Sequence, residues 1–165
     1  MPKKLTEFFK MPKAALVIGS ISAFALLFAF TLQYGFDVQP CILCLWQRVP
    51  FGLVMALSLA GYFMHPYGRQ TQIIFVLCSV IFLVGAGLAF FHTGVELHWW
   101  LGTKGCSIQP LSGTSVEDLR TQLLHTVVAH CDQISWTFLG LSMANWNVPF
   151  SLGLAAFSLK AAKDV

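Results

Sequence analysis

The residues best suited to chemistry form a dithiol motif, Cys41-Ile42-Leu43-Cys44, with Arg48 close behind it. The two cysteines are spaced i, i+3, so they share one face of a first helical turn or close a tight disulfide. Arg48 follows Cys44 by four residues and is expected near the second sulfur. A helix N-terminus, a guanidinium and the Cys-x-x-Cys arrangement all favour a thiolate. Cys44 is therefore the candidate reactive thiolate, although half a zinc site or a structural disulfide would give the same motif.

Two further cysteines, Cys106 and Cys131, stand in the long polar stretch 92–145. One pair at a helix start and one in a loop are suited to a thiol-disulfide relay. The alternative is a structural disulfide between Cys106 and Cys131, whose closed loop would contribute roughly 3 kcal/mol by chain entropy. No metal site is expected, because four-cysteine zinc sites usually carry two Cys-x-x-Cys pairs. Cys78 stands alone in an apolar run and is expected to be a core residue.

Membrane helices are the elements that would position these cysteines. Of the 165 residues, 56% are apolar and 10% are charged, whereas soluble domains carry about a quarter charged residues. The length suits about four spans of roughly 20 residues. We therefore expect an all-α four-transmembrane-helix bundle that forms a single membrane domain over residues 1–165. The small positive net charge gives no sign of nucleic-acid binding, since no basic stripe with interleaved aromatic residues occurs.

The apolar runs predict spans at about 14–34, 45–64, 71–91 and 146–162. The two cysteine pairs then lie in a short first loop at about 35–44 and a long second loop at about 92–145. The first apolar run exceeds the roughly 7–15 residues of a signal-peptide core, which favours a span over a cleaved signal. Apolar residues at helical spacing over 116–128 predict an amphipathic helix, either on the membrane surface or packed within its own loop.

Basic residues predict the orientation of the bundle. They gather at the chain ends and in the turn between the second and third spans: Lys3, Lys4, Lys10, Lys13, Arg69, Lys160 and Lys163. The cysteine side has fewer, namely Lys104, Arg120 and, at its border, Arg48. Because basic loops stay in the cytoplasm, both termini are expected there and the two cysteine pairs on the oxidising side of the membrane.

Several motifs spread over most of the chain carry a family resemblance: Cys41-Ile42-Leu43-Cys44 with Trp46-Gln47-Arg48, Phe91-His92-Thr93-Gly94-Val95-Glu96 with Trp99-Trp100, Cys106, Cys131-Asp132 with Trp136, and Phe138-Leu139-Gly140-Leu141-Ser142-Met143. In these motifs the chain resembles the disulfide bond formation protein B (DsbB) family of bacterial inner-membrane thiol oxidases. The resemblance implies a four-helix membrane bundle with periplasmic cysteine loops. It also implies an enzyme that reoxidises a soluble periplasmic thioredoxin-fold oxidant (DsbA-like) and passes the electrons to a membrane quinone, ubiquinone or menaquinone.

The resemblance also implies a role for each cysteine. Cys106 and Cys131 would form the loop disulfide that the reduced partner attacks. Cys41 and Cys44 would receive those electrons, with Cys44 facing the quinone. Arg48 would hold the quinone and favour the thiolate, which agrees with its spacing. The chain departs from some family members at position 47, where it has glutamine in place of an acidic residue.

His92 and Glu96 stand where the third expected span leaves the membrane, beside Trp99 and Trp100. A quinone site needs a flat apolar slot with a polar end, so His92 or Glu96 could assist quinone binding. Ordinary anchoring at the membrane interface would also explain the tryptophans.

A structural four-span scaffold with two inert disulfides is the alternative function. Such a scaffold gives no reason to place Arg48 in an apolar span, which costs about 2.5–3.5 kcal/mol at mid-membrane and less near the interface. A membrane reductant that runs the same relay backwards is a third hypothesis, because the direction depends on reduction potentials.

Overall fold

The computed structural model describes residues 13–64, 69–103, 106, 130–134 and 136–164. Most of them form long helices: α2 (Lys13–Gly35), α3 (Ile42–Met64), α4 (Arg69–Glu96) and α6 (Met143–Lys163). A two-stranded antiparallel hairpin, β1 (Thr137–Phe138) and β2 (Leu141–Ser142), leads into α6. The predicted helical class is confirmed for the described residues. The amphipathic helix expected over 116–128 lies outside them.

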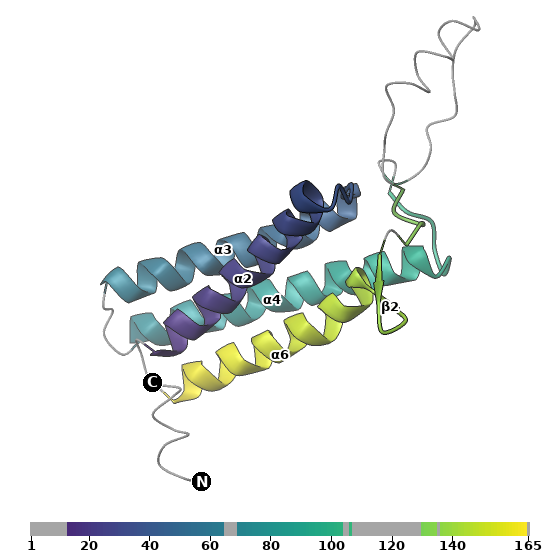
Figure 1. Cartoon of the computed structure of the whole chain (residues 1–165). Coiled ribbons are helices and arrows are strands. Elements are labelled where there is room, and N and C mark those ends of the chain that lie inside the picture. Colours follow the sequence, from purple (N-terminus) through teal and green to yellow (C-terminus); the bar gives the residue numbers. More distant parts are fainter. Residues whose placement is uncertain (1–12, 65–68, 104–105, 107–129, 135, 165) are drawn as a thin grey trace, which may run out of the picture.

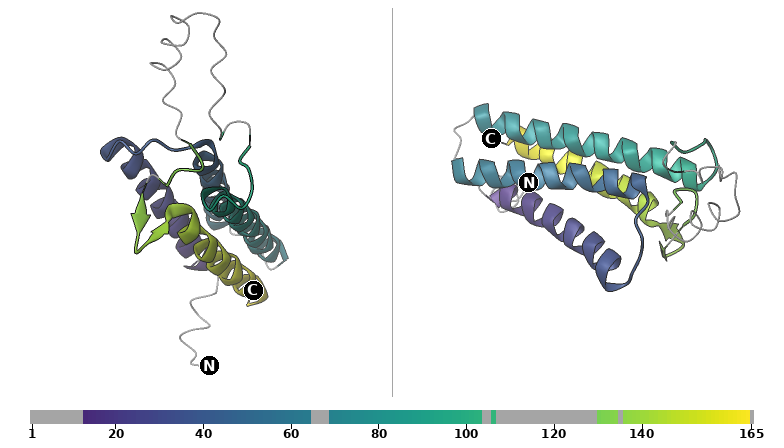
Figure 2. Two further views of the ribbon diagram at one scale, coloured as in Figure 1. Left: turned by 90° about the vertical axis from the view of Figure 1, so that its right-hand side faces the viewer. Right: turned by 90° about the horizontal axis from the view of Figure 1, so that it is seen from above.

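The helices run back and forth along one common direction (Figure 1). Helix α2 packs on α3, α3 packs on α4, and α4 packs most extensively on α6. Two further views confirm that the helices lie side by side (Figure 2). As a result, the start of α2, the end of α3, the start of α4 and the end of α6 lie at one end of the bundle. The start of α3, the end of α4 and the hairpin lie at the other.

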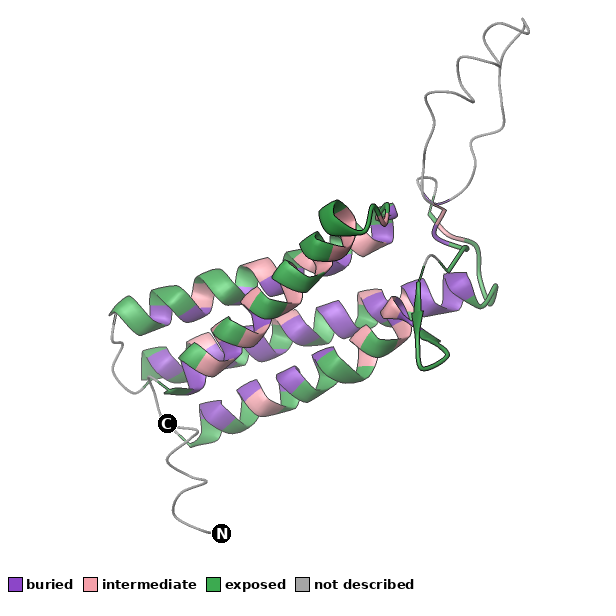
Figure 3. Ribbon diagram, viewed as in Figure 1, coloured by how far each residue is buried: buried purple, intermediate pink, exposed green. Residues whose placement is uncertain are grey.

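Three of these helices are long and apolar enough to cross a membrane, with mean hydropathies of 2.3 over Lys13–Gly35, 1.6 over Ile42–Phe63 and 2.8 over Arg69–Glu96. Their outward faces are exposed (Figure 3) and carry large apolar side chains such as Phe24, Leu53 and Val84. Exposed apolar surface of this extent is suited to contact with lipid. The described part of the chain therefore has the character of a membrane protein.

Aromatic rings and small residues together hold the helices in contact. The ring of Phe51 in α3 lies 5.7 Å from that of Phe82 in α4 and 6.0 Å from that of Phe150 in α6, centroid to centroid. The Ser79 hydroxyl donates a hydrogen bond of 3.0 Å to the carbonyl of Ala155, which joins α4 to α6. Cys78 is 1% exposed and lies in the same core, in agreement with its predicted structural role.

Capping residues stand at the starts of two helices, both of which begin before the expected membrane spans. Helix α3 starts at Ile42, which puts the dithiol at the helix start as its spacing predicts, and Cys41 Sγ accepts a hydrogen bond from the backbone N–H of Cys44 at 3.3 Å. Helix α6 starts at Met143 rather than near Trp146, because the Ser142 hydroxyl accepts from the backbone N–H of Asn145. Both caps lie at the cysteine end of the bundle.

Helix α4 continues past its expected end at Phe91 and stops at Glu96. His98 takes a left-handed conformation with φ of 59°, and the N–H of Trp99 bonds to the carbonyl of Gly94 at 2.8 Å. This is the Schellman arrangement of a helix C-terminus. The chain then folds back, so that the Trp100 ring stacks on the Phe91 ring and its Nε1 donates to the Phe91 carbonyl at 2.9 Å.

Gly94 allows this fold-back, and its replacement by alanine should destabilise the protein. A Cβ atom at position 94 would lie 2.0 Å from a carbon of the Trp100 ring, so the tryptophan would have to move. Overpacking of this kind costs about 1–3 kcal/mol. We expect Gly94→Ala to lower the midpoint of thermal unfolding in detergent. Gly87→Ala is the matched control in the same helix, since a Cβ there meets nothing within 4 Å. Equal midpoints for both variants would contradict this packing.

Candidate functional site

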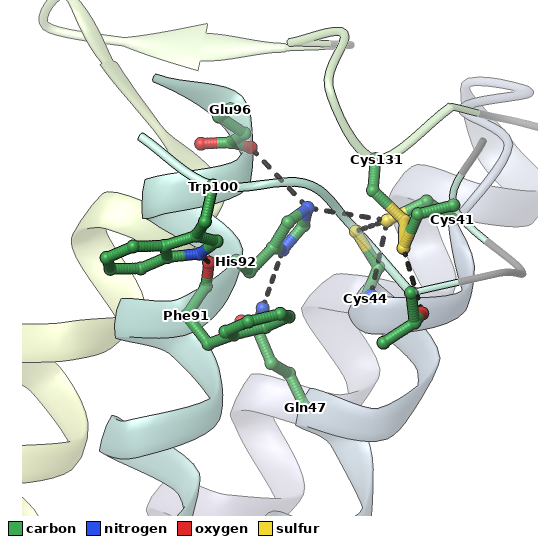
Figure 4. Close-up of a disulfide and its surroundings, with 10 residues drawn as sticks. Cys41, Cys44, Gln47, Phe91, His92, Glu96, Trp100 and Cys131 are labelled. Carbon is green, nitrogen blue, oxygen red and sulfur yellow. Dashed lines mark hydrogen bonds and ion pairs between the residues drawn. A yellow bond between two sulfur atoms is a disulfide. The ribbon is translucent and has the colours of Figure 1, made fainter. Parts of the chain in front are cut away.

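Both cysteine pairs lie in one buried cluster at the end of the bundle where α3 begins and α4 ends (Figure 4). Cys131 is 0% exposed, Cys106 3% and Cys41 5%. The other members of the cluster are apolar side chains and the second cysteine of the motif: Leu43, Val95, Cys44 and Phe91. Residues that are far apart in the sequence therefore meet where thiol-disulfide exchange could pass from one pair to the other.

Cys106 and Cys131 form a disulfide in this cluster. The segment after α4 passes close above it, since a Cβ atom at Gly102 would lie 2.6 Å from the Cβ of Cys106. The Thr103 hydroxyl lies 3.4 Å from Cys106 Sγ. Glycine at position 102 therefore allows the backbone to pass close to Cys106, where a larger residue would clash with the disulfide.

Cys41 and Cys44 are free thiols whose sulfur atoms lie 3.0 Å apart. The hydrogen bond with the Cys44 side chain, together with the contact to His92 Nε2 at 3.5 Å, outweighs burial and lowers the pKa of Cys41. Cys41 also occupies the capping position of α3, where the helix dipole favours an anion. These contacts favour Cys41 as the thiolate, in contrast to the expectation from spacing that Cys44 would be.

Arg48 is held by α2. Its Nη1 donates a hydrogen bond of 2.5 Å to Gln33 Oε1, and its guanidinium carbon lies 5.1 Å from the centroid of the Phe30 ring. Both contacts direct the guanidinium to the interface between α2 and α3 rather than to the Cys44 sulfur. Its partner Gln33 is neutral, so this hydrogen bond leaves the positive charge of Arg48 uncompensated.

A chain of hydrogen bonds crosses three helices and ends at Cys41. Gln47 Nε2 lies 2.7 Å from His92 Nδ1, and Gln47 Oε1 accepts from Asn147 Nδ2 at 2.7 Å. The Ser151 hydroxyl donates to Asn147 Oδ1 at 3.0 Å. Sequence reasoning singled out His92 but missed Gln47, Asn147 and Ser151 as its supports. Polar residues at i, i+4 on the inner face of an apolar helix were the available signal.

Glu96 forms the other side of this pocket. Its Oε1 lies 3.8 Å from His92 Nε2, and its Oε2 accepts a short hydrogen bond from the Ser142 hydroxyl, the residue that caps α6. The carboxylate therefore links the end of α4 to the start of α6. The structure thus brings His92 and Glu96 together beside Cys41, as Figure 4 shows.

The donor atoms of Cys41, Cys44 and His92 lie within 4.8 Å of one another, and sulfur with imidazole nitrogen is a set that zinc prefers. The hydrogen bonds direct this cluster towards thiol chemistry instead. His92 Nε2 lies 3.5 Å from Cys41 Sγ and 3.8 Å from Glu96 Oε1, so the nitrogen that a metal would need already contacts the sulfur.

Residues 12–161 match the family model described as disulfide bond formation protein DsbB. The chain is 33% identical over 156 residues to disulfide bond formation protein B of Xanthomonas campestris pv. campestris (strain 8004), covering 90% of this chain and 89% of that protein. It is 33% identical over 138 residues to the protein of the same description from Hahella chejuensis, covering 78% and 79%. The corresponding protein of Xylella fastidiosa (strain Temecula1 / ATCC 700964) is 33% identical over 141 residues, covering 81% and 79%.

The predicted family is confirmed by these matches, and the family model covers the described helices α2, α3, α4 and nearly all of α6, together with every residue of the cysteine cluster. Because a family model and relatives at this identity cover most of the chain, the protein belongs to the DsbB family of membrane disulfide bond formation proteins.

Proposed function

We propose that this protein is a quinone-dependent thiol oxidase of the bacterial inner membrane. Its substrate would be the reduced dithiol of a soluble periplasmic thioredoxin-fold oxidant (DsbA-like), and its electron acceptor would be ubiquinone or menaquinone. The observation that carries the proposal is the single buried cluster in which the loop disulfide packs beside the Cys41–Cys44 dithiol. A scaffold stapled by two inert disulfides gives no reason to bury one cysteine pair against the other.

Two exchanges would move the electrons inward. A partner thiolate attacks the Cys106–Cys131 disulfide, and the second partner thiol resolves the mixed disulfide, which leaves the partner oxidised and both loop cysteines as thiols. A loop thiolate then attacks the Cys41–Cys44 disulfide, and the other loop thiol resolves that adduct. The products are a restored loop disulfide and a reduced Cys41–Cys44 dithiol, the combination of bonded and free cysteines found in the structure.

The Cys41–Cys44 dithiol must finally lose two electrons and two protons, and a quinone, when bound, accepts both. Arg48, one helical turn beyond Cys44 in α3, and its neighbours in α2 fit such a molecule. A guanidinium has five N–H donors, and the bond to Gln33 engages Nη1 of Arg48. The Phe30 ring beside it is a flat apolar surface. A donor next to an apolar ring matches a quinone, which has carbonyl oxygens on a flat apolar ring.

His92 and Glu96 belong, in this proposal, to the thiol step rather than to the quinone. Both lie beside Cys41, and Glu96 is bonded to Ser142 at the start of α6. Their place near the capping sulfur suits the stabilisation of a thiolate and the handling of its proton.

The proposed orientation has both termini in the cytoplasm and the cysteine loops in the periplasm, with α6 as the fourth span. Helix α2 begins at Lys13, α4 begins at Arg69 and α6 ends at Lys163, all at the end of the bundle opposite the cysteines. This distribution agrees with the retention of basic segments in the cytoplasm. Helix α6 has 21 residues, a length of about 31 Å that matches a hydrocarbon core of about 30 Å.

Purified protein mixed with a reduced thioredoxin-fold dithiol and a soluble quinone should consume the quinone. The measurement is quinone absorbance, together with the thiol content of the partner. Cys78→Ala should turn over at the wild-type rate, because Cys78 lies in the core away from the cluster. Failure of the wild-type protein to consume quinone would favour the scaffold. Reduction of an oxidised partner by quinol would favour the reductant.

Cys131→Ala, mixed with the oxidised partner, should trap Cys106 in a disulfide with it: the Cys106 thiolate attacks the partner disulfide, one partner thiolate leaves, and Cys131 is no longer present to resolve the adduct. A mixed disulfide persists when the resolving thiol is absent, so the adduct should appear as a band of added mass on a non-reducing gel and disappear on reduction. Cys78→Ala serves as the control that forms no such adduct. If Cys106→Ala forms the stable adduct and Cys131→Ala does not, the two loop cysteines have the opposite roles.

Substitutions of Arg48 should separate charge from geometry. Arg48→Lys keeps the cation but loses the forked donor group, so the KM for quinone should rise about tenfold, as for the loss of one hydrogen bond to a charged group. Arg48→Ala should raise it further. The KM for the dithiol partner should stay within about twofold in both variants. Unchanged quinone KM values would leave Arg48 with an anchoring role between α2 and α3.

A further inference from the structure

The hydrogen-bond chain through Gln47 has a chemical consequence for the dithiol. We propose that Gln47, itself held by Asn147, is a positioning residue that keeps the proton of neutral His92 on Nε2, where it hydrogen bonds to the sulfur of Cys41. This inference deepens the proposed function, on which it rests for the use of the thiolate. The hydrogen-bonding arrangement itself can be tested in the absence of any partner or quinone.

The surroundings of His92 decide which ring nitrogen carries the proton. Nε2 faces Cys41 Sγ at 3.5 Å and Glu96 Oε1 at 3.8 Å. Both groups are acceptors when ionised. An unprotonated Nε2 would direct its lone pair at these negative charges, whereas a protonated Nε2 can donate a hydrogen bond to them. The proton therefore belongs on Nε2. Nδ1 of the neutral ring is then an acceptor and needs a donor.

Gln47 supplies that donor, and α6 fixes its orientation. The Nδ1 atom of His92 lies 2.7 Å from Gln47 Nε2, the amide nitrogen. Gln47 Oε1 is occupied by the amide of Asn147, and Asn147 Oδ1 accepts from Ser151. Because His92 is 3% and Gln47 8% exposed, water is poorly placed to replace either partner. A buried amide that loses its hydrogen-bond partner costs about 1–3 kcal/mol, and this cost keeps the side chains of His92, Gln47 and Asn147 in the hydrogen-bonding arrangement described here.

A carboxylate at position 47 would reverse the arrangement. It has no proton to donate, so it would require N–H at His92 Nδ1. A neutral ring would then present a bare Nε2 to Cys41. Glutamine is thus the residue that directs an N–H donor at the sulfur, although it touches neither cysteine through the contacts described above.

The charged and titratable groups around Cys41 are few in the described part of the chain. Helix α3 contributes the Cys44 thiol, and α4 contributes His92 and Glu96. The loop contributes the Cys106–Cys131 disulfide, which does not titrate. Helix α6 contributes the neutral side chains of Asn147 and Ser151, which are linked to His92 through the hydrogen bonds of Gln47. The His92 donor is therefore the contact from outside α3 on which the Cys41 thiolate depends.

The test uses reduced full-length protein in detergent and two readouts. The first is the ¹⁵N chemical shift of the two His92 ring nitrogens, which distinguishes a protonated from a bare nitrogen. The second is the pH dependence of Cys41 alkylation, resolved by site with mass spectrometry. Because the hydrogen bond with Cys44 and the contact with His92 lower the pKa of Cys41, alkylation of the wild-type protein should continue at a pH below the usual range of a cysteine thiol.

Gln47→Leu should remove the donor to Nδ1 and raise the pKa of Cys41 by at least about one unit, a tenfold loss of thiolate at a pH below the new value. Gln47→Glu should move the His92 proton to Nδ1. Asn147→Leu, which leaves Gln47 in place but unsupported, should shift both readouts in the same direction by less, and it replaces Gln47→Leu if that variant fails to fold. Ser79→Ala is the matched control, since it removes another buried bond between α4 and α6 without contact to His92.

Protonation at Nδ1 in the wild-type protein would overturn the proposal. So would a Gln47→Leu variant with wild-type His92 shifts and a wild-type alkylation profile, or a Ser79→Ala variant that changes both readouts as strongly. Since neither readout involves turnover, loss of quinone reduction in the assay above would leave this result standing. Likewise, a failure of the His92 and Cys41 measurements would leave the result of the quinone assay unchanged.

Discussion

Polar side chains inside an apolar bundle have no water to bind, so Gln47, His92 and Asn147 must satisfy one another. This constraint organises the functional end of the protein. It ties α3, α4 and α6 together at one level through directional hydrogen bonds. The neighbouring middle part of the bundle is held instead by the shapes of Phe51, Phe82 and small residues. Directional bonds hold a side chain in one orientation, which a reacting sulfur requires and a packed ring does not.

The helix termini extend the same principle. Cys41 caps α3, Ser142 caps α6 and bonds to Glu96, and α4 ends in a Schellman arrangement that returns the chain over the cluster. Each terminus satisfies backbone groups that would otherwise be unpaired. In doing so, each also places a functional residue. The groups that end the helices are therefore largely the groups that surround the dithiol.

The bundle separates two kinds of charge. Basic residues stand at the helix ends far from the cysteines, whereas the sulfur atoms, imidazole and carboxylate gather at the other end. Among the described residues Arg48 is the exception, since it is a cation one helical turn beyond Cys44 that bonds to a neutral amide of α2. A cation in such a place carries a desolvation cost that a purely structural residue has little reason to bear. This is the physical basis for linking Arg48 to an electron-rich ligand.

Local pattern in the sequence was sufficient for the helical membrane class, the core position of Cys78 and the family. Apolar runs, isolated cysteines and motif spacing are properties of neighbouring residues, and they survive folding unchanged. The capping of α3 by Cys41 is also local, and the spacing already placed the dithiol in a first helical turn. Spacing alone did not show which of the two sulfur atoms accepts the backbone N–H at the helix start.

Only the tertiary structure decided which distant groups meet. It directed Arg48 towards Gln33 and Phe30, joined Gln47 to His92 and Asn147, and buried Cys106 and Cys131 over Cys41. These partners come from different helices, and their contacts depend on how each helix is rotated about its axis. That rotation is set by the packing of whole helix faces, so no single motif contains it. The sequence by itself determined which reactive residues the chain carries, and the packing of the helices decided which of their atoms lie within contact distance of one another.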